Sequence, residues 1–450
     1  MVIKIPPQVN TVIEILNANG KSAYVVGGAC RDILMDKTAH DWDVTTSALP
    51  EETAAFFSDY KVIETGIKHG TVTVIVDSVS IEVTTYRIES GYSDNRHPDS
   101  VAFTDRIEDD LARRDFTVNA IAYSPVHGTV DPYGGIGDIK KEIIRCVGDP
   151  DTRFGEDALR ILRALRFSSV LGFEIEEETK ESIKRNYRLL SNISAERIFA
   201  EICKMLCGKD VKRILTEFSE VIFFIMPELE PMKNCMQNHE RHVYDVWSHT
   251  VAAVDAVRPE AHLRFAMLLH DSGKPHVRTT DENGTDHFYQ HAKKSLKIAE
   301  DILFRMKCSN RFRKTVCDLI AHHDFLPDKI SRKTYKKYMA SLGTETVREL
   351  FYVREADVRA QNPVFLENEL KANEIGLNVL SEIENEKACL SISDLQISGK
   401  DLSEAGIPAS PEMGNILGML LDEVMDEKLD NEKNALLERA TELYKTRNGN

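Results

Sequence analysis

The sequence predicts an α+β chain in which a small head with a mixed sheet and helices is followed by an extended all-α body. Short β-rich runs, separated by glycine and aspartate turns, are confined to about the first 150 residues. From about residue 151 onward, apolar residues recur with helical spacing instead. A chain of 450 residues is too long for one ordinary core, so several domains are expected.

The head segment alternates a short amphipathic helix with strand-like runs. The helix is expected over residues 9–18, and the strands over 23–28, 41–46, 71–76 and 79–87. The body opens with helices over 156–173, 177–190 and 194–206, continues with a helical block rich in histidine, and ends in a turn-rich stretch before a last amphipathic helix. These sequence patterns predict four domains: residues 1–150, 151–237, 238–365 and 366–450.

Composition excludes several classes of protein. The chain is 42% hydrophobic and 29% charged, and it has no apolar run near the roughly 20 residues that span a bilayer. The N-terminus lacks the layout of a signal peptide, and the eight cysteines show no zinc-ribbon spacing, so we expect a reducing cytoplasm and no membrane association. A net charge of −16 argues against non-specific nucleic-acid binding by the whole chain but allows a local basic cleft.

Two aspartates, Asp41 and Asp43, alternate within a strand-like run, which places both side chains on one face. Such carboxylates repel each other unless a cation lies between them, and carboxylate and water ligands suit Mg²⁺. Glu82, on a later strand, is a candidate third acid. Taken alone, the pair also fits a solvated strand end. The preceding glycine pair, ending at Gly28, and Arg31 add an anion cradle, so together they predict a magnesium site for phosphoryl or nucleotidyl transfer.

Two further stretches combine arginine with aspartate. "RRDF" contains Arg114 and Asp115, which also fit a structural ion pair. "EDALRILRALRF" places an acid and three arginines at successive steps of three along a helix: Asp157, Arg160, Arg163 and Arg166. A carboxylate beside a guanidinium offers acceptors and donors together, as reading a nucleotide base or holding a triphosphate requires. The alternative is a solvated charged face.

Taken in order, "GGACRD…DWDV", "RRDFTVNAIAY", "DPYGGIGDI" and "EDALRILRALRF" resemble the head and neck motifs of class II tRNA nucleotidyltransferases, the CCA-adding enzymes. Bacterial poly(A) polymerases are close relatives in the same polymerase-beta-like superfamily. The resemblance covers about the first 200 residues. It implies addition of CCA to the 3′ end of tRNA from CTP and ATP, with tRNA held along the helical body by its shape and phosphates.

The resemblance also implies a role for each matching residue. Asp41 and Asp43 would bind Mg²⁺, with Glu82 as the third carboxylate. Gly28, Arg31 and Arg114 would hold the nucleotide phosphates and Asp115 would lie near the ribose. Asp157 and Arg160 would pair with the incoming base, and Arg163 and Arg166 would line the same pocket.

Residues 85–105, which include Tyr92, Asp94 and Arg96, occupy the place of the loop that family members need to add the terminal A. Relatives that add only CC lack this loop, so addition of the terminal A is expected. The stretches "EDALRILRALRFSSVLGFEI" and "SGKDLSEAGIPASPEMGNILGMLLDEV" resemble those of bacterial CCA-adding enzymes, so full CCA addition is favoured over A-only or poly(A) synthesis. Two other readings remain open: a phosphohydrolase whose head merely senses a nucleotide, and a non-catalytic RNA-binding module. An intact pair of acids beside a base-reading helix argues against both.

The histidine-rich block resembles the H…HD…D signature of HD-domain phosphohydrolases. The resemblance implies a divalent-metal site in this block. Its candidate ligands are His249, His270, Asp271, His291, His322, His323 and Asp357. Imidazole and carboxylate together suit Mn, Fe, Ni or Mg better than a closed zinc site. Lys274, just after the His-Asp pair, is placed to orient a phosphate. Some bacterial CCA-adding enzymes couple such a domain to phosphatase or 2′,3′-cyclic phosphodiesterase activity.

Overall fold

The computed structural model describes residues 4–39, 41–67, 70–92, 99–386 and 388–448, so Asp94 and Arg96 lie outside the described residues. The chain forms two compact units: residues 1–227 with 305–307, and residues 228–304 with 308–450. The first contains a mixed sheet and the second is almost entirely helical, which confirms the predicted fold class. The four-part division of the chain stays a prediction.

The sheet of the first unit has seven strands in the described part of the chain, in the order β3-β4-β5-β2-β1-β8-β9. β2 and β5 run parallel, whereas the other neighbouring strands are antiparallel. The strands are β1 (Ala23–Val26), β2 (Asp43–Thr46), β3 (Lys61–Ile63), β4 (Thr71–Val76), β5 (Val79–Thr85), β8 (Ala122–Ser124) and β9 (Gly128–Val130).

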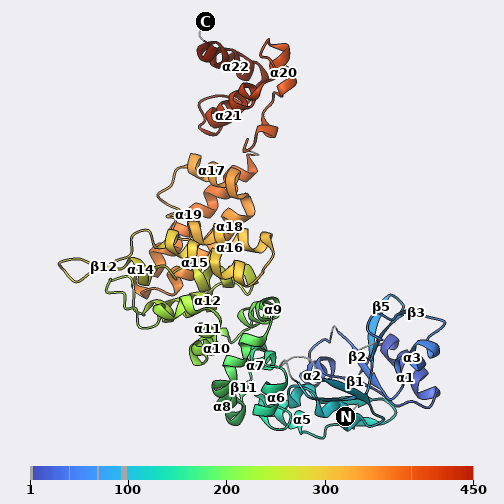
Figure 1. Cartoon of the computed structure of the whole chain (residues 1–450). Coiled ribbons are helices and arrows are strands. Elements are labelled where there is room, and N and C mark those ends of the chain that lie inside the picture. Colours follow the sequence, from blue (N-terminus) through green and yellow to red (C-terminus); the bar gives the residue numbers. More distant parts are fainter. Residues whose placement is uncertain (1–3, 40, 68–69, 93–98, 387, 449–450) are drawn as a thin grey trace. The chain divides into compact units, whose positions relative to one another are not determined.

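Burial along the strands follows their apolar residues. All four residues of β1 are buried, as expected of a strand inside the sheet, and β4 alternates half-buried threonine or isoleucine with buried valine. Helices α1 (Pro7–Ala18) and α3 (Pro50–Phe56) pack on the sheet (Figure 1). The remaining head elements are α2 (Gly28–Leu34), β6 (Arg87–Ser90), β7 (Ser100–Phe103), α4 (Ile107–Ala112), α5 (Gly135–Lys141) and β10 (Ile143–Ile144).

Helices complete the first unit, and one crossing among them is unusually close. They are α6 (Pro150–Glu156), α7 (Leu159–Leu171), α8 (Glu177–Asn186), α9 (Ala195–Leu206), α10 (Val211–Glu217) and α11 (Ser219–Ile225), with β11 (Glu174–Ile175) between α7 and α8. Gly208, just after α9, approaches α7 so closely that a Cβ there would lie 2.1 Å from the Ser169 Oγ. Glycine is therefore required for this packing.

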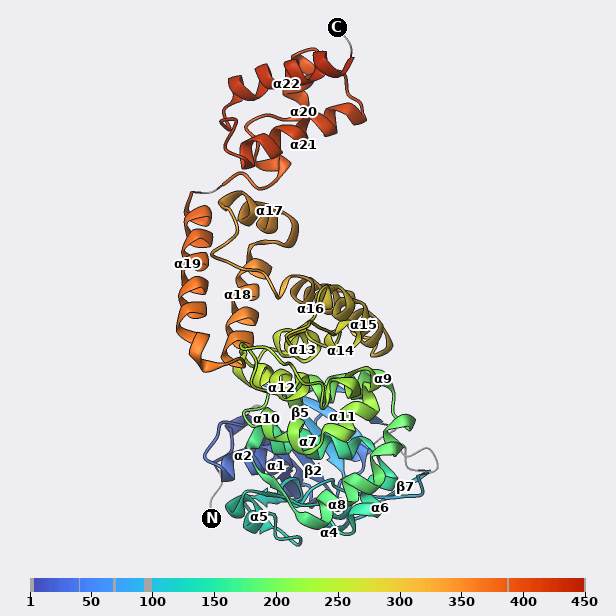
Figure 2. The ribbon, with the colours of Figure 1, turned by 90° about the vertical axis from the view of Figure 1, so that its left-hand side faces the viewer.

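The second unit is built mainly from helices. They are α12 (Val246–Ala256), α13 (Ala261–Leu269), α14 (Lys274–Val277), α15 (His291–Arg305), α16 (Asn310–His322), α17 (Arg332–Leu342), α18 (Thr344–Arg359) and α19 (Leu366–Asn385). A short hairpin, β12 (Thr279–Thr280) and β13 (Asp286–His287), precedes α15. Figure 2 shows α18 and α19 running side by side.

The C-terminal residues of this unit have a core of their own. Helices α20 (Gly399–Glu404), α21 (Pro411–Met425) and α22 (Lys433–Asn448) enclose a buried cluster that includes Leu402, Ile416, Leu420 and Leu436. Among the residues described, the helices are all too short or too polar to cross a membrane.

Candidate active site and metal centre

The predicted carboxylate platform lies where β2 and β5 run side by side. β2 begins at Asp43, which pairs in register with Glu82 of β5, so the two side chains share one face of the sheet. Asp41 precedes the strand rather than lying within it, which differs from the predicted strand over 41–46. Loss of hydration around the Asp43 carboxyl raises its pKa, and the charges of Glu82 and Asp41 raise it further. The three acids therefore repel one another.

The glycine turn between β1 and α2 lies against two arginines. Gly27 has φ 71°, a conformation that favours glycine, and a Cβ there would lie 3.2 Å from the Arg114 Nη1. A Cβ on Gly28 would lie 3.6 Å from the Arg31 Nη2. The turn thus brings backbone and two guanidinium groups together, and Arg114 lowers the pKa of nearby Asp43 against the effect of the acids.

Asp110, which sequence reasoning missed, holds the arginine pair of "RRD". Its carboxylate is fully buried and accepts hydrogen bonds from Arg113 Nη2 at 2.7 Å and Arg114 Nη2 at 3.2 Å. The Thr45 hydroxyl donates to the same carboxylate at 3.3 Å. An acid three and four residues before two arginines on a helix is a recognisable signal for such pairing. The Arg114 Nε makes no hydrogen bond within the described chain.

Asp115 links the head to α7. Its carboxylate, 7% exposed, accepts from Arg163 Nε at 2.8 Å, from Asn119 Nδ2 and from the backbone amide of Phe116. Burial raises the pKa of Asp115, but the Arg163 charge and these hydrogen bonds outweigh it and bring the pKa to about 2. Asn119 also accepts from Arg31 Nη1 at 2.7 Å. Arg31 and Asp115 are thereby tied to one another.

Asp157 interrupts the helix that sequence periodicity predicted to be continuous from residue 156. α6 ends at Glu156 and α7 begins at Leu159, and the Asp157 side chain accepts from the Leu159 amide at 3.1 Å. Arg197 of α9, another residue that the sequence analysis missed, donates to the other Asp157 oxygen at 3.0 Å. The helix break and Arg197 together fix the orientation of this carboxylate.

Arg160 lies in the first turn of α7 and is 8% exposed. Its Nη1 donates to Glu156 and to the carbonyl of Arg153, and its Nη2 donates to the carbonyl of Arg113 at 3.0 Å. A guanidinium has five N–H groups, so these contacts leave donors for a ligand.

Three of the predicted arginines surround one aromatic ring. The guanidinium carbons of Arg31, Arg163 and Arg166 lie 5.2, 5.4 and 4.1 Å from the centre of the Phe167 ring. Arg166 also pairs with Glu201 at 3.2 Å. Arg31 pairs with Asp32 at 2.7 Å and Arg163 with Asp115 at 2.6 Å, so each of these cations has an acidic partner besides its cation–π contact with Phe167.

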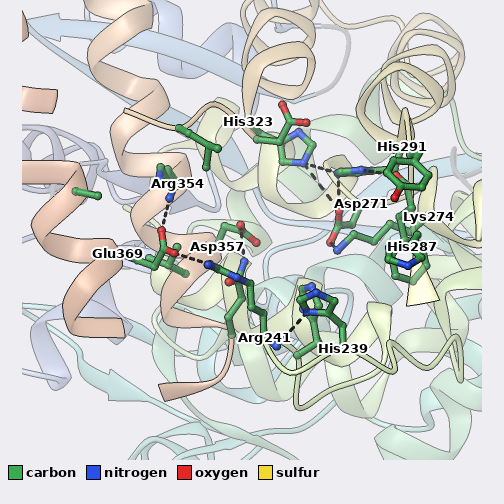
Figure 3. A pocket seen from close by; sticks show the side chains of 18 of the residues that line it. His239, Arg241, Asp271, Lys274, His287, His291, His323, Arg354, Asp357 and Glu369 are labelled. Carbon is green, nitrogen blue, oxygen red and sulfur yellow. Dashed lines mark hydrogen bonds and ion pairs between the residues drawn. The ribbon is translucent and has the colours of Figure 1, made fainter. Parts of the chain in front are cut away.

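The second unit brings six of the seven predicted metal ligands together. His249 lies on α12, His270 and Asp271 follow α13, and His291 begins α15, whereas His323 follows α16 and Asp357 lies on α18. Four imidazole Nε2 atoms lie 3.2 to 3.9 Å from an oxygen of Asp271. The His249 Nε2 also lies 2.9 Å from the Asp357 Oδ1. Figure 3 shows Asp271 close to His291, His323 and Lys274.

Each of these four imidazoles is oriented in the same way. The Nδ1 atoms of His249, His270, His291 and His323 lie 2.7 to 3.2 Å from the backbone carbonyls of Ala360, Met267, Phe288 and Ile320. A carbonyl can only accept, so each Nδ1 carries a proton and each Nε2 faces the centre, where it could offer its lone pair to a metal ion; the Nε2 atoms of His291 and His323 lie 3.1 Å apart. This arrangement is typical of metal-binding histidines.

The residues present fit a divalent cation. Neither oxygen of Asp271 makes a hydrogen bond within the described chain, although the carboxylate is 1% exposed and the Lys274 Nζ lies 2.7 Å away. His270 Nε2 likewise has no hydrogen-bond partner there. Two triads, His249-His270-Asp271 and Asp271-His291-His323, each place three ligand atoms within 4.8 Å of one another, with Asp271 in both. These residues would hold a divalent metal, whose charge would compensate the buried Asp271 carboxylate.

The seventh candidate, His322, does not reach this centre. Its ring lies 5.2 Å from that of Tyr338 instead. His242, which sequence reasoning missed, packs at 5.5 Å against His249 and lines the cavity above the centre. Burial and the Lys274 charge lower the pKa of His242 to about 3, so the ring is neutral near pH 7.

The chain matches three family models in order. Residues 23–145 match "Poly A polymerase head domain", residues 172–232 match "Probable RNA and SrmB- binding site of polymerase A", and residues 279–440 match tRNA nucleotidyltransferase domain 2. Together with the in-register acids and the arginine-rich turn, these matches relate the first unit to the nucleotidyltransferase head domain and to the RNA-binding segment after it.

Relatives define the family more closely. A CCA-adding enzyme of Lactobacillus delbrueckii subsp. bulgaricus is 33% identical over 96% of both chains, and one of Anoxybacillus flavithermus is 43% identical over 58% of this chain and 64% of its own. The structure of the Bacillus stearothermophilus CCA-adding enzyme in complex with CTP has a TM-score of 0.74, with 29% identity and 99% coverage of both chains. The chain belongs to the CCA-adding family of tRNA nucleotidyltransferases.

Proposed function

We propose that the chain adds the cytidine, cytidine and adenosine residues of the tRNA 3′ end from CTP and ATP, in a reaction that depends on Mg²⁺. The observation that carries the proposal is the in-register pairing of Asp43 with Glu82, beside the glycine turn and Arg114. The CTP bound to the Bacillus stearothermophilus enzyme supports the choice of nucleotide. All eight cysteines are free, which supports the proposal that the protein acts in a reducing cytoplasm.

Asp41 and Asp43 would hold the magnesium, and Glu82 would complete the acidic face. Their mutual repulsion makes the site favourable for a cation, and the all-oxygen donor set suits magnesium. When bound, magnesium neutralises triphosphate charge and makes the attacking hydroxyl easier to deprotonate. The acids themselves fix where the tRNA 3′ hydroxyl and the α-phosphate meet.

The nucleotide would lie between the glycine turn and α7. Arg31, Arg114 and the backbone at Gly28 would bind the phosphates, because the turn brings these groups together. Asp115, tied to Arg31 through Asn119, would contact the ribose. These groups act by positioning and charge stabilisation, without a covalent intermediate.

Base selection would rest on Asp157 and Arg160. The Asp157 carboxylate accepts one hydrogen bond on each oxygen, and each oxygen retains a second acceptor site. Arg160 keeps unused donors, so the pair offers acceptors and donors to a base edge. Arg163 and Arg166, held beside Phe167, would line the pocket.

The test is incorporation of labelled CTP and ATP into a tRNA that ends at its discriminator base. We expect addition of C, C and A followed by a stop, and at least a 100-fold loss in Asp41→Ala and Asp43→Ala. Asp59→Ala, an exposed acid on the same unit, is the matched control and should keep full activity. A growing A tail on unrelated RNA would instead indicate poly(A) synthesis. Full activity of Asp43→Ala would refute the assigned metal platform.

A second function is favoured by the centre in the other unit. We infer that the two triads around Asp271 bind two divalent ions such as Mn²⁺ and hydrolyse phosphate esters, as an HD-type site would. The supporting observation is that four imidazoles, each oriented through Nδ1, present Nε2 to a buried carboxylate that makes no hydrogen bond within the described chain. The Lys274 ammonium pairs with Asp271 at 2.7 Å and donates to the Gln237 Oε1 at 2.8 Å, which leaves one of its three N–H groups for a phosphate.

Neighbouring histidines provide the control for this function. His323→Ala should abolish metal-dependent phosphatase activity and weaken Mn²⁺ binding, whereas His322→Ala, one residue earlier but turned toward Tyr338, should change neither. Asp271→Ala should abolish hydrolysis and leave nucleotide addition intact, and Asp41→Ala should do the reverse. Equal behaviour of the two histidine variants would contradict the assigned ligand set.

A further inference from the structure

A cavity of about 670 Å³ opens above the proposed dinuclear centre, a size within the roughly 300–1,000 Å³ of small-molecule sites. Asp271, His291, His323 and Asp357 lie among its lining residues (Figure 3). The cavity is also lined by His287 and Tyr289, which flank Phe288 on the segment that leads from β13 into α15. None of the proposed metal chemistry uses these two rings.

The two rings stack on each other. Their centres lie 5.4 Å apart and their planes differ by 9°, the geometry of a stacked pair. Alternate side chains of an extended segment point to the same side, which explains the pairing of His287 with Tyr289. Tyr289 is 72% exposed, so this large aromatic side chain remains largely uncovered. A flat ligand can therefore extend the stack.

The hairpin holds this surface in place. Asp286, 2% exposed, accepts from the Asn238 amide, from Arg278 Nη2 and from the Thr280 hydroxyl, at 2.7 to 2.9 Å. Burial raises the pKa of Asp286, but these partners bring it to about 2, so the anchor stays charged at neutral pH. The His287 Nε2 lies 3.1 Å from the Asp281 Oδ2, which fixes that ring. A ligand that binds a preorganised surface loses less free energy to the ordering of side chains.

The same short segment reaches the metal centre. Tyr289 is two residues from His291, a separation of at most about 7 Å along the backbone. The Phe288 carbonyl orients the His291 ring, and the Lys274 ammonium lies 5.4 Å from the centre of the Phe288 ring. Tyr289 and the proposed ligand His291 thus lie on one short segment and line the same cavity.

We propose that His287 and Tyr289 form a stacking surface for the nucleobase of a nucleoside monophosphate whose phosphate lies at the dinuclear centre. This inference rests on the proposed hydrolytic function and names its substrate class. In the reaction a water oxygen bonds to phosphorus as the ester P–O bond breaks. One water proton passes to the leaving nucleoside oxygen, and the other remains on the released inorganic phosphate.

The experiment compares two phosphate esters that differ only in the base, adenosine 5′-monophosphate and ribose 5-phosphate. Binding by calorimetry and turnover are both measured on the full chain loaded with Mn²⁺. Tyr289→Ala is compared with Tyr289→Phe, which keeps the ring, and with Phe304→Ala, which removes an equally exposed ring outside the cavity. Nucleotide binding by the head is common to all variants, so their differences isolate this cavity.

We expect Tyr289→Ala to weaken adenosine monophosphate binding and raise its KM about tenfold, because stacking on an aromatic ring contributes about 1–3 kcal/mol per base. Ribose 5-phosphate should be unaffected, and Tyr289→Phe and Phe304→Ala should behave as wild type. Equal losses for both esters, unchanged adenosine monophosphate binding, or the same Tyr289 dependence with phenyl phosphate would overturn the nucleobase surface. Binding that depends on Tyr289 without turnover would support the surface and refute only the hydrolytic function.

Discussion

Replacing Asp115 by asparagine tests the link between the head and α7. The substitution keeps the shape of the side chain but removes the charge that Arg163 contacts through Nε at 2.8 Å and Nη2 at 2.6 Å. It therefore imitates the protonated carboxyl permanently. The variant isolates the contribution of the ion pair from that of packing.

The pKa of Asp115 gives the magnitude. It lies at about 2 in the folded protein against an ordinary 3.8. At about 1.4 kcal/mol per pKa unit, the charged form contributes about 2 kcal/mol to the free energy of unfolding at pH 7. Because the folded pKa is the lower one, this contribution is complete above pH 3.8 and is lost as the pH falls toward 2. At pH 3 roughly half of this contribution should remain.

Urea denaturation followed by the fluorescence of Trp42 measures this difference. The chain has two tryptophans, and Trp247 lies in the other unit, so a Trp247→Phe background makes Trp42 the reporter of the first unit. Asp105→Asn, an exposed acid, serves as control and should change the free energy of unfolding by less than about 0.5 kcal/mol. A loss in Asp115→Asn that is the same at pH 7 and pH 3 would refute the ion-pair explanation.

Three other changes have clear expected outcomes. Arg197→Ala should lower the preference for CTP over ATP at the C-adding step about fivefold, because Asp157 loses a partner; an unchanged ratio of kcat/KM values would contradict this. Gly208→Ala should cost about 2 kcal/mol in urea denaturation because its Cβ meets α7, whereas Gly137→Ala, which meets nothing, should cost nothing; equal values would refute the steric argument. Mn²⁺ at 100 times its Kd should stabilise the second unit by about 2.7 kcal/mol in wild type but not in Asp271→Asn, as thermal denaturation would show.

Residues whose chemistry is local could be predicted from the sequence. The strands that carry Asp43 and Glu82 were predicted from β-rich runs between turn residues, and the mixed sheet and helical body are confirmed. The register that places these two acids directly opposite each other could not be predicted, because it depends on parallel pairing between strands far apart in sequence.

Other features depend on side-chain contacts that the spacing of apolar residues does not reveal. The Asp157 side chain accepts from a backbone amide and interrupts a helix that its neighbours favour. The adjacent pair His322 and His323 gave no indication of which ring faces the centre, since successive helical residues point in different directions. Arg197 could not be predicted because its partner lies 40 positions earlier in the chain.

Because Asp43 lies directly opposite Glu82, the head gives up some folding stability in order to bind a cation. A neutral pair at these positions would make a sturdier sheet but would leave nothing to attract a cation. With both acids present, the sheet without a bound ion contains electrostatic repulsion between two carboxylates, which a bound cation would relieve. Ion loading should thus strengthen the architecture as well as prepare it for catalysis, and a shortage of ions would weaken both at once.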